Sequence, residues 1–307
     1  MIKTIPHGVY TAMVTPFTEK NNVDTDSLKR MIDYQIESGI DGLVPCGTSG
    51  ESPTLSHEEH DRVIQLTVEY VNGRVPVIAG TGSNATSEAI RLSRHAQNHG
   101  ADAVLLVNPY YNKPTQKGLY LHFKAIADAV DIPCIVYNIK GRTGVNVETQ
   151  TLVRLAQDCS NIVAVKEASG NLEQMKDVIV RTEGKDFTVL SGDDNICLDL
   201  IKAGGHGVVS VASNLFPKQM SDMIHAALAG DWQKAQAIND LLAPFFKACF
   251  VETNPIPIKT ALAHFGWCLE SFRLPLCTLD EQTDHRQQLF KVIDDLKDRL
   301  PGIGEGR

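Results

Sequence analysis

A lysine directly follows an apolar run in which β-branched residues dominate. The run is IVAV at 162–165, and Lys166 comes next. An ammonium has an ordinary pKa of ~10.4, but a pocket that removes water from it lowers that pKa and leaves an amine able to attack a carbonyl. The alternatives are a lysine that extends its charge to solvent or one paired with Glu167. Neighbouring residues of a strand face opposite sides, which disfavours the pairing.

Three tyrosines follow the apolar runs that precede Lys166 in the chain. Tyr137 ends one run, and Tyr110 and Tyr111 come directly after the run before it. A phenol near an amine can carry the protons that move on nitrogen and oxygen when an imine forms. The alternative for each tyrosine is aromatic packing at the rim of the fold.

Two glycine-flanked segments could bind carboxylates. Thr48 and Ser49 lie in GTSGE at 47–51, a loop that can offer hydroxyls and backbone N–H groups. Arg142 lies in GRTG at 141–144 and could hold a second carboxylate through two parallel hydrogen bonds. The alternatives are a tight turn for the first segment and a solvated arginine for the second.

Two further patterns resemble cofactor motifs. GTGSNA at 80–85 fits G-x-G-x-x-A after a strand, but the acidic residue that should close the next strand is missing, since Asp102 opens that strand. His57 and His60 in SHEEH are spaced i and i+3, whereas the helical zinc motif needs i and i+4. We therefore expect neither a nicotinamide cofactor nor a metal.

The elements that must position these residues alternate between strands and helices. The segments between the strand runs have apolar residues at helical spacing, and Ser56 and Glu59 have the S-x-x-E spacing of a capping box. Strands that are apolar nearly throughout pair in parallel and are buried on both faces, so eight of them predict a (β/α)8 barrel. The eight runs begin at Gly8, Gly39, Pro76, Asp102, Pro133, Ile162, Phe187 and Gly205.

The predicted barrel explains where the candidate residues lie. Catalytic groups of this fold come from the C-terminal ends of strands, and each polar cluster follows a strand run. After Phe216 the strand pattern disappears, and we predict helices at 220–229, 232–250, 257–265 and 280–300. We therefore predict a catalytic barrel over residues 1–229 and a helical C-terminal domain over residues 230–307.

Composition argues against several classes of partner. The 307 residues carry a formal net charge of -8 and no Lys/Arg-rich block, so neither nucleic acid nor a membrane surface is an expected partner. The seven cysteines are scattered and never form Cys-x-x-Cys, which favours free thiols in a reducing compartment. The chain has no run of about 18 apolar residues and no signal-peptide pattern. We expect a cytoplasmic protein.

Taken together, the motifs resemble one family. GTSGES, GTGSNATSEAI, NPYYNKP, YNIKGRTG, VAVKEASGN, LSGDD, GGHGVVSV and NPIPIK occur over essentially the whole chain. In order and spacing they resemble the dihydrodipicolinate synthase family, pyruvate-dependent class I aldolases related to N-acetylneuraminate lyase. The resemblance implies condensation of pyruvate with L-aspartate 4-semialdehyde in the diaminopimelate route to L-lysine, without a cofactor.

The resemblance also implies roles for the candidates. Lys166 forms a Schiff base with pyruvate, the enamine adds to the aldehyde, and the substrate's own amine then takes over the imine and frees the lysine. Tyr137 donates and accepts protons. Thr48 and Tyr111 complete its relay, with Tyr111 reaching in from a neighbouring subunit of a homotetramer built as a dimer of tight dimers.

Substrate carboxylates have their own implied partners. Ser49 and the backbone near Val209 hold the carboxylate of pyruvate, and Gly192 is a further substrate-binding position. Arg142 holds the carboxylate of the aldehyde. Sialic acid lyases do not typically carry Arg-Thr-Gly after the tyrosine strand, so Arg142 favours a small substrate over a sugar acid.

A second site is implied at the tight dimer interface. Members of the family that L-lysine inhibits bind it there, and acceptors with a carboxylate suit its ammonium. We therefore expect feedback inhibition by L-lysine. The matching positions are Ser52, Pro53, His57, His60, Asn84, Glu88 and Tyr110.

Three positions depart from the family pattern. Lys140 stands where proline is usual, which should loosen the loop before Arg142 and place a second amine near the pocket. Ser49 stands where threonine is frequent, and Pro53 where some relatives have a small residue. Two other functions remain open: a pyruvate aldolase for a keto sugar acid or hydroxy-oxoglutarate, and a catalytically silent barrel that serves as a binding subunit.

Overall fold

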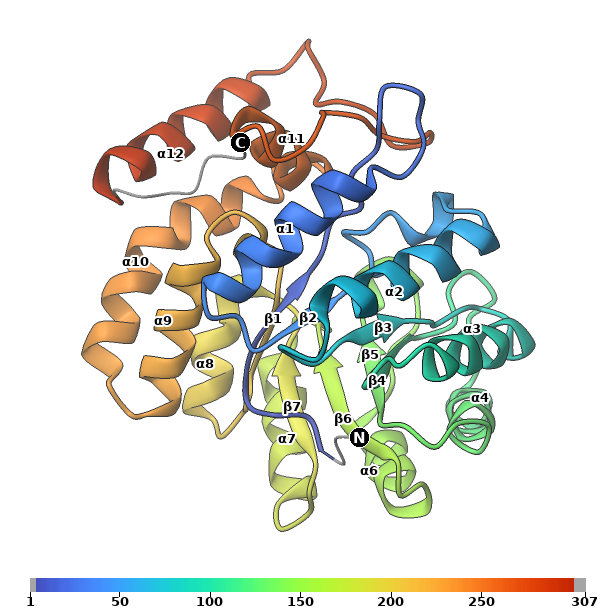
Figure 1. The fold of residues 1–307 in the computed structure, drawn as a ribbon. Coiled ribbons are helices and arrows are strands. Elements are labelled where there is room, and N and C mark those ends of the chain that lie inside the picture. Colours follow the sequence, from blue (N-terminus) through green and yellow to red (C-terminus); the bar gives the residue numbers. More distant parts are fainter. Residues whose placement is uncertain (1–3, 301–307) are drawn as a thin grey trace.

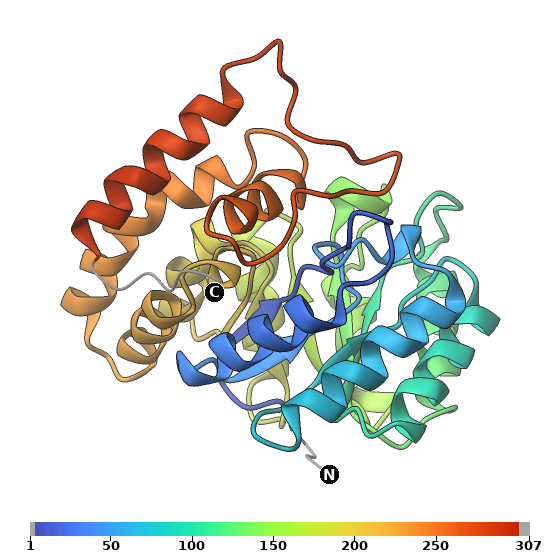
Figure 2. The same cartoon turned by 45° about the horizontal axis from the view of Figure 1, so that its top comes forward.

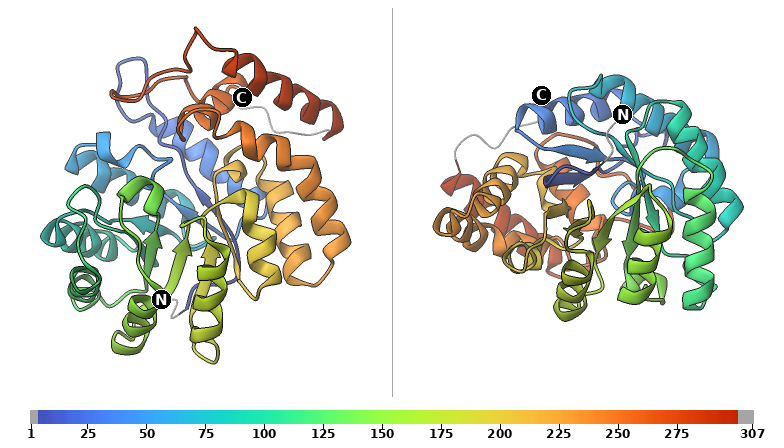
Figure 3. Two further views of the ribbon diagram at one scale, coloured as in Figure 1. Left: turned by 180° about the vertical axis from the view of Figure 1, so that it is seen from behind. Right: turned by 90° about the horizontal axis from the view of Figure 1, so that it is seen from below.

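Eight parallel strands form a barrel inside a layer of helices in the computed structural model, which describes residues 4–300. Figure 1 shows the strands at the centre, and the view from below in Figure 3 shows helices around them. Each predicted strand run contains one observed strand, so the strand prediction is confirmed. The strands are β1 (Gly8–Ala12), β2 (Gly42–Val44), β3 (Ile78–Gly80), β4 (Ala103–Val107), β5 (Cys134–Asn138), β6 (Ile162–Glu167), β7 (Thr188–Ser191) and β8 (Gly207–Ser210).

The strands follow one another around the barrel in the order β2-β1-β8-β7-β6-β5-β4-β3. An isolated parallel bridge between Leu43 and Val77 brings the two ends of this sheet together. The N–H of Gly80 also donates to the carbonyl of Pro45 at 3.0 Å. The sheet is therefore nearly closed, which confirms the (β/α)8 prediction.

The apolar strands have two buried faces, as predicted. One cluster of buried side chains, including Ile135, Ala164 and Leu190, takes at least one residue from every strand and fills the barrel. Neighbours in the same strands, such as Val136 and Val165, belong to the larger cluster that packs against the helices. Because side chains alternate along a strand, the same run supplies both layers.

Four sequence signals for helix ends are confirmed, whereas the predicted helices at 220–229 and 280–300 begin at Pro217 and His285. The N–H of Glu59 donates to Ser56 Oγ and the N–H of Ser56 to Glu59 Oε2, which confirms the capping box. Gly39, Gly100 and Gly204 follow helices with φ of 86°, 89° and 98°. The barrel helices are α1 (Thr25–Glu37), α2 (His57–Val71), α3 (Thr86–Asn98), α4 (Gln116–Ala127), α5 (Lys140–Thr143), α6 (Thr149–Asp158), α7 (Leu172–Thr182), α8 (Cys197–Lys202) and α9 (Pro217–Leu228).

Three further helices follow the barrel: α10 (Trp232–Ala248), α11 (Ile256–His264) and α12 (His285–Arg299). α10 packs against α9 and α12, and Figure 2 shows α11 close to the end of the barrel toward which the strands point. The domain boundary at residue 230 falls in the turn between α9 and α10 and stays a prediction. Within residues 4–300, no helix has both the length and the apolar character needed to cross a membrane.

Candidate active site

Lys166 and Tyr137 lie side by side near the C-terminal ends of adjacent strands. They are direct partners in the register of β6 and β5. The Lys166 Nζ lies 4.1 Å from the centre of the Tyr137 ring, close enough for a cation–π contact. Each residue is only 5% exposed. The structure therefore holds an amine and a phenol together, away from bulk water.

Glu167 is turned away from Lys166 and has other partners. Its carboxylate accepts hydrogen bonds from Asn138 Nδ2 at 3.0 Å, the N–H of Ser169 at 3.0 Å and Gln174 Nε2 at 3.2 Å. Burial raises the pKa of this carboxyl, while those hydrogen bonds oppose the rise. The alternative in which Glu167 neutralises the lysine is thus wrong, because the two side chains occupy opposite faces of β6.

Gly192 provides room for the lysine side chain. A Cβ at position 192 would lie 3.0 Å from Lys166 Cε and 2.6 Å from the Cβ of Ala168. The N–H of Gly192 also donates to the carbonyl of Glu167 at 2.8 Å, which fixes it beside β6. Val209 is buried on β8 and belongs to the cluster inside the barrel.

The loop after β2 carries the two candidate hydroxyls. Thr48 lines a cavity at the mouth of the barrel, whereas Ser49 is buried and its Oγ accepts a hydrogen bond from Asn254 Nδ2 at 3.1 Å. Thr15 Oγ1 donates to the carbonyl of Gly50 at 2.7 Å and ties the loop to the segment after β1. The two hydroxyls therefore sit in a loop that is fixed from two sides.

Arg142 lies on the short helix α5 and lines the same cavity. Its Nη2 donates to the carbonyl oxygen of Asn254 at 3.0 Å. Asn254 thus contacts both residues predicted to bind carboxylates, Arg142 and Ser49. Asn254 opens the motif NPIPIK, and no pattern in the sequence assigns it a role at the site.

One cavity of about 500 Å³ joins the candidate active site to the predicted lysine site. Thr48, Tyr137 and Arg142 line it from the catalytic set. Lys166 is not among the lining residues, but it contacts Tyr137, which is one of them. From the predicted lysine site, the lining residues are Ser52, Pro53, His57, His60, Glu88 and Tyr110. We call this space the mouth cavity.

Glu88 is the carboxylate of the predicted lysine site. His57 Nε2 lies 2.8 Å from Glu88 Oε1, and the hydroxyl of Ser83 donates to Glu88 Oε2. The bond from Ser83, followed by that from His57, holds the pKa of Glu88 below its usual value. Asn84 does not line the cavity, but its Nδ2 donates to the carbonyl of Tyr110 at 3.2 Å.

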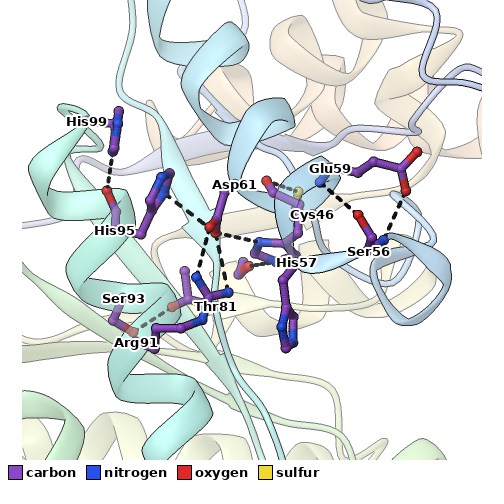
Figure 4. A network of polar contacts seen from close by, with 12 residues as sticks. Cys46, Ser56, His57, Glu59, Asp61, Thr81, Arg91, Ser93, His95 and His99 are labelled. Carbon is purple, nitrogen blue, oxygen red and sulfur yellow. Dashed lines mark hydrogen bonds and ion pairs between the residues drawn. The ribbon is translucent and has the colours of Figure 1, made fainter.

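His60 is the buried member of this set. Its Nε2 lies 3.0 Å from the carbonyl oxygen of Gly80, and burial lowers its pKa. Behind it, Asp61 pairs with Arg91 at 2.8 Å and lies 3.6 Å from His95 Nδ1 (Figure 4). These contacts join α2 to α3. Within residues 4–300, no group of three or more His, Cys, Asp or Glu side chains is placed to hold a metal.

Tyr111 is separate from the other catalytic candidates within one chain. It is 91% exposed, has a φ of 73° and does not line the mouth cavity. Its contact with a relay across a subunit interface stays a prediction. Lys140, the rival amine, is exposed at the start of α5 and does not line the cavity either.

A buried ion pair near the site was not predicted. Lys259 Nζ lies 2.6 Å from Glu51 Oε1, and both side chains are fully buried. Glu51 belongs to GTSGES and Lys259 to NPIPIK. The sequence offered one hint of this pair: each of the two motifs contains one charged residue, and the two charges are opposite.

Comparisons with known proteins agree on one family. The model of the "Dihydrodipicolinate synthetase family" matches residues 5–296. A curated 4-hydroxy-tetrahydrodipicolinate synthase from Syntrophus aciditrophicus is 54% identical over 286 residues, which is 93% of this chain and 97% of that protein. A crystal structure of the chloride-inhibited dihydrodipicolinate synthase from Acinetobacter baumannii, complexed with pyruvate, is 45% identical with a TM-score of 0.92 and covers 95% of this chain and 99% of that one. The Cyanidioschyzon merolae enzyme with lysine bound is 41% identical with a TM-score of 0.91, over 95% and 99% of the two chains.

Proposed function

The chain belongs to the dihydrodipicolinate synthetase family of aldolase-type lyases, and from this premise we propose that it condenses pyruvate with L-aspartate 4-semialdehyde through a Schiff base on Lys166. The observation that carries the proposal is the contact between Lys166 and Tyr137 at the active end of the barrel. The product is 4-hydroxy-tetrahydrodipicolinate, an intermediate of L-lysine biosynthesis.

The first steps need an amine and a proton carrier in contact. The Lys166 amine attacks the keto carbon of pyruvate, and water leaves as the imine forms, so protons must move between nitrogen and oxygen. Tyr137 touches Lys166 and is placed to move them. Loss of a methyl proton then gives the enamine.

The later steps release the lysine. The enamine carbon adds to the aldehyde carbon of the second substrate, whose oxygen takes up a proton. The substrate's own amine then attacks the imine carbon, which closes the ring and expels the Lys166 amine. Thr48 lines the mouth cavity with Tyr137 and is proposed to pass protons to it.

Carboxylate binding sets the orientation of both substrates. Ser49, with the backbone near Gly192 and Val209, is proposed to hold pyruvate, and Arg142 the carboxylate of the aldehyde. Support comes from Asn254, which contacts both Ser49 and Arg142 and so couples the two anchors. The relative from Acinetobacter baumannii that is complexed with pyruvate supports the choice of keto acid.

The assembly is proposed to be a homotetramer in which Tyr111 completes the relay of a neighbouring subunit. Exposure of 91% supports this, because it leaves the ring free to contact another subunit and tyrosine is enriched at interfaces. We also propose that the enzyme works in the cytoplasm, since all seven cysteines are free thiols, which suits a reducing compartment.

L-Lysine is proposed as the feedback inhibitor, bound in the part of the mouth cavity next to α2 and α3. Glu88 supplies a carboxylate for its ammonium, and His57 lies beside it. The relative from Cyanidioschyzon merolae with lysine bound supports this proposal. Unchanged initial rates at saturating lysine in a coupled assay would show the assignment to be wrong.

Borohydride reduction in the presence of pyruvate tests the central proposal. Peptide mass mapping is expected to find the reduced adduct on Lys166 and none in a K166M variant. An adduct on Lys140, or no adduct, would contradict the mechanism. Steady-state rates with L-aspartate 4-semialdehyde and with sugar aldehydes then decide between this reaction and that of another pyruvate aldolase.

A further inference from the structure

The pair formed by Glu51 and Lys259 connects the active-site loop to the C-terminal helices. Glu51 lies in the loop after β2, three residues beyond Thr48, and Lys259 lies on α11. Their charged atoms are 2.6 Å apart, and neither side chain is exposed. The Lys259 Nζ also lies 4.1 Å from the centre of the Phe17 ring. Phe17 and Phe272 therefore lie beside the ammonium, and Glu51 is its one carboxylate partner among the described residues.

Glu51 holds a backbone conformation that a side chain rarely adopts. Its φ is 52° and its ψ is 34°, in the left-handed region. For a residue other than glycine this costs roughly a few RT and persists where neighbouring contacts fix it. The N–H of Glu51 donates to the carbonyl of Thr48 at 3.2 Å, so the turn that Glu51 completes is the one that carries Thr48 and Ser49.

Stability alone is a weak reason for such a pair. Moving two charges out of water costs about as much free energy as their attraction provides. A protein in which neutral residues of similar shape replace the pair is often equally stable. Burial lowers the pKa of Lys259, and the carboxylate of Glu51 opposes that shift. Beyond any effect on stability, the pair fixes the position of the loop relative to α11.

We propose that Lys259 is a positioning residue, which fixes the loop of residues 47–51 through Glu51 and so keeps the Thr48 and Ser49 hydroxyls where the reaction needs them. The same helix segment reaches the site a second time, since Asn254, just before α11, donates to Ser49 Oγ at 3.1 Å. The C-terminal helices thus take part in building the active site.

This inference rests on the proposed function, and the experiment separates the two. Borohydride trapping of the unaltered enzyme with pyruvate is measured first, and failure to label Lys166 there contradicts the proposed function. The variants K259M and E51Q/K259M are then compared with it for melting temperature, kcat, kcat/KM for pyruvate and the rate of trapping.

The double variant gives the decisive readout, because it leaves no buried charge unpaired. We expect its melting temperature to recover to within about 5 °C of the unaltered enzyme. We expect its kcat/KM for pyruvate and its trapping rate to stay about 10- to 100-fold lower, as for a small displacement of aligned groups. A purely structural pair would recover activity and stability together.

The pair formed by Arg286 and Glu270 is the matched control. It also lies in the C-terminal region, with two hydrogen bonds of 2.7 and 2.9 Å, and among residues 4–300 no hydrogen bond or ion pair joins it to the loop of residues 47–51. R286M/E270Q is expected to keep its trapping rate. The proposal is overturned if E51Q/K259M has the activity of the unaltered enzyme, if its loss only matches that of the control, or if it fails to fold, since the pair would then act through stability.

Discussion

Lys166 and Tyr137 are paired across β6 and β5 so that the lysine Nζ lies 4.1 Å from the centre of the tyrosine ring. Both residues are the second from last of their strands. Their separation is thus set by the hydrogen-bonded register of two buried strands. Groups carried on such rigid elements are held more accurately than groups on loops, which suits a proton transfer that depends on distance.

Removing the phenol oxygen of Tyr137 tests its role in proton transfer. The Y137F variant keeps the ring that contacts Lys166, so we expect the fold and the KM for pyruvate to change little. We expect kcat to fall about 10²- to 10⁴-fold, the usual contribution of a positioned acid or base. Steady-state kinetics measure this. Y120F is the control, since it removes a phenol that is bonded to Asp158 on α6, and a similar loss in both variants would contradict the role.

The sequence allowed the barrel and the position of the site within it to be predicted. Runs such as 162–165 are apolar on both faces. This pattern is typical of a strand that is buried between the barrel interior and the surrounding helices. A polar residue directly after such a run, as with Lys166, then falls at one end of the barrel. Position in the chain therefore implied position in space for every candidate that ends a strand.

The contacts that support the site could not be predicted in the same way. Glu51 and Lys259 are 208 positions apart, and no local pattern states which helix will lie over which loop. Lys259 lies on a helix and has the character of a surface residue until the fold buries it. For Tyr111 the structure of one chain is not sufficient either. Its proposed partner belongs to another chain, and within its own chain it is exposed.

Arg142 is expected to act on the second substrate. R142M removes the guanidinium. We expect the KM for L-aspartate 4-semialdehyde to rise about 10- to 100-fold, which corresponds to the free energy of hydrogen bonds to a charged group. The KM for pyruvate should change much less. R154M, which removes an exposed arginine of α6, is the control. A rise in the pyruvate KM instead would assign Arg142 to the other carboxylate.

Glu88 is expected to set the sensitivity to L-lysine. E88Q keeps the shape and the contacts with His57 and Ser83 but removes the charge that would attract an ammonium. We expect the lysine concentration for half inhibition to rise about tenfold, the effect of ~1.4 kcal/mol. Initial rates over a range of lysine concentrations measure it. E173Q, which neutralises an exposed glutamate of α7, should leave that concentration unchanged.

Glu59 should make stability depend on pH. Its carboxylate accepts two hydrogen bonds of 2.6 Å from Arg273, and this contact holds its pKa below the usual value. A carboxyl with a lowered folded-state pKa stabilises fully above its unfolded pKa of ~4.3 and loses that effect as the pH falls through the folded value. We expect E59Q to be less stable by about 1–2 kcal/mol at pH 7. Urea unfolding should show the deficit shrinking below about pH 4, and a constant deficit would contradict the contact.

The reaction should require glycine at position 192, because a side chain there would take up the space of Lys166. A Cβ there would meet Lys166 Cε at 3.0 Å and the Cβ of Ala168 at 2.6 Å, so G192A must displace the lysine or the strand end beside it. We expect the rate of borohydride trapping with pyruvate to fall about 10- to 100-fold, because a displaced amine meets the keto carbon at the wrong position.

A second glycine provides the control for that substitution. Gly141 precedes Arg142 in the same part of the site, and a Cβ at position 141 would meet nothing within 4 Å. G141A is therefore expected to trap pyruvate at nearly the rate of the unaltered enzyme. If G192A and G141A behave alike, space beside Lys166 is not limiting, and Gly192 would act through its backbone instead.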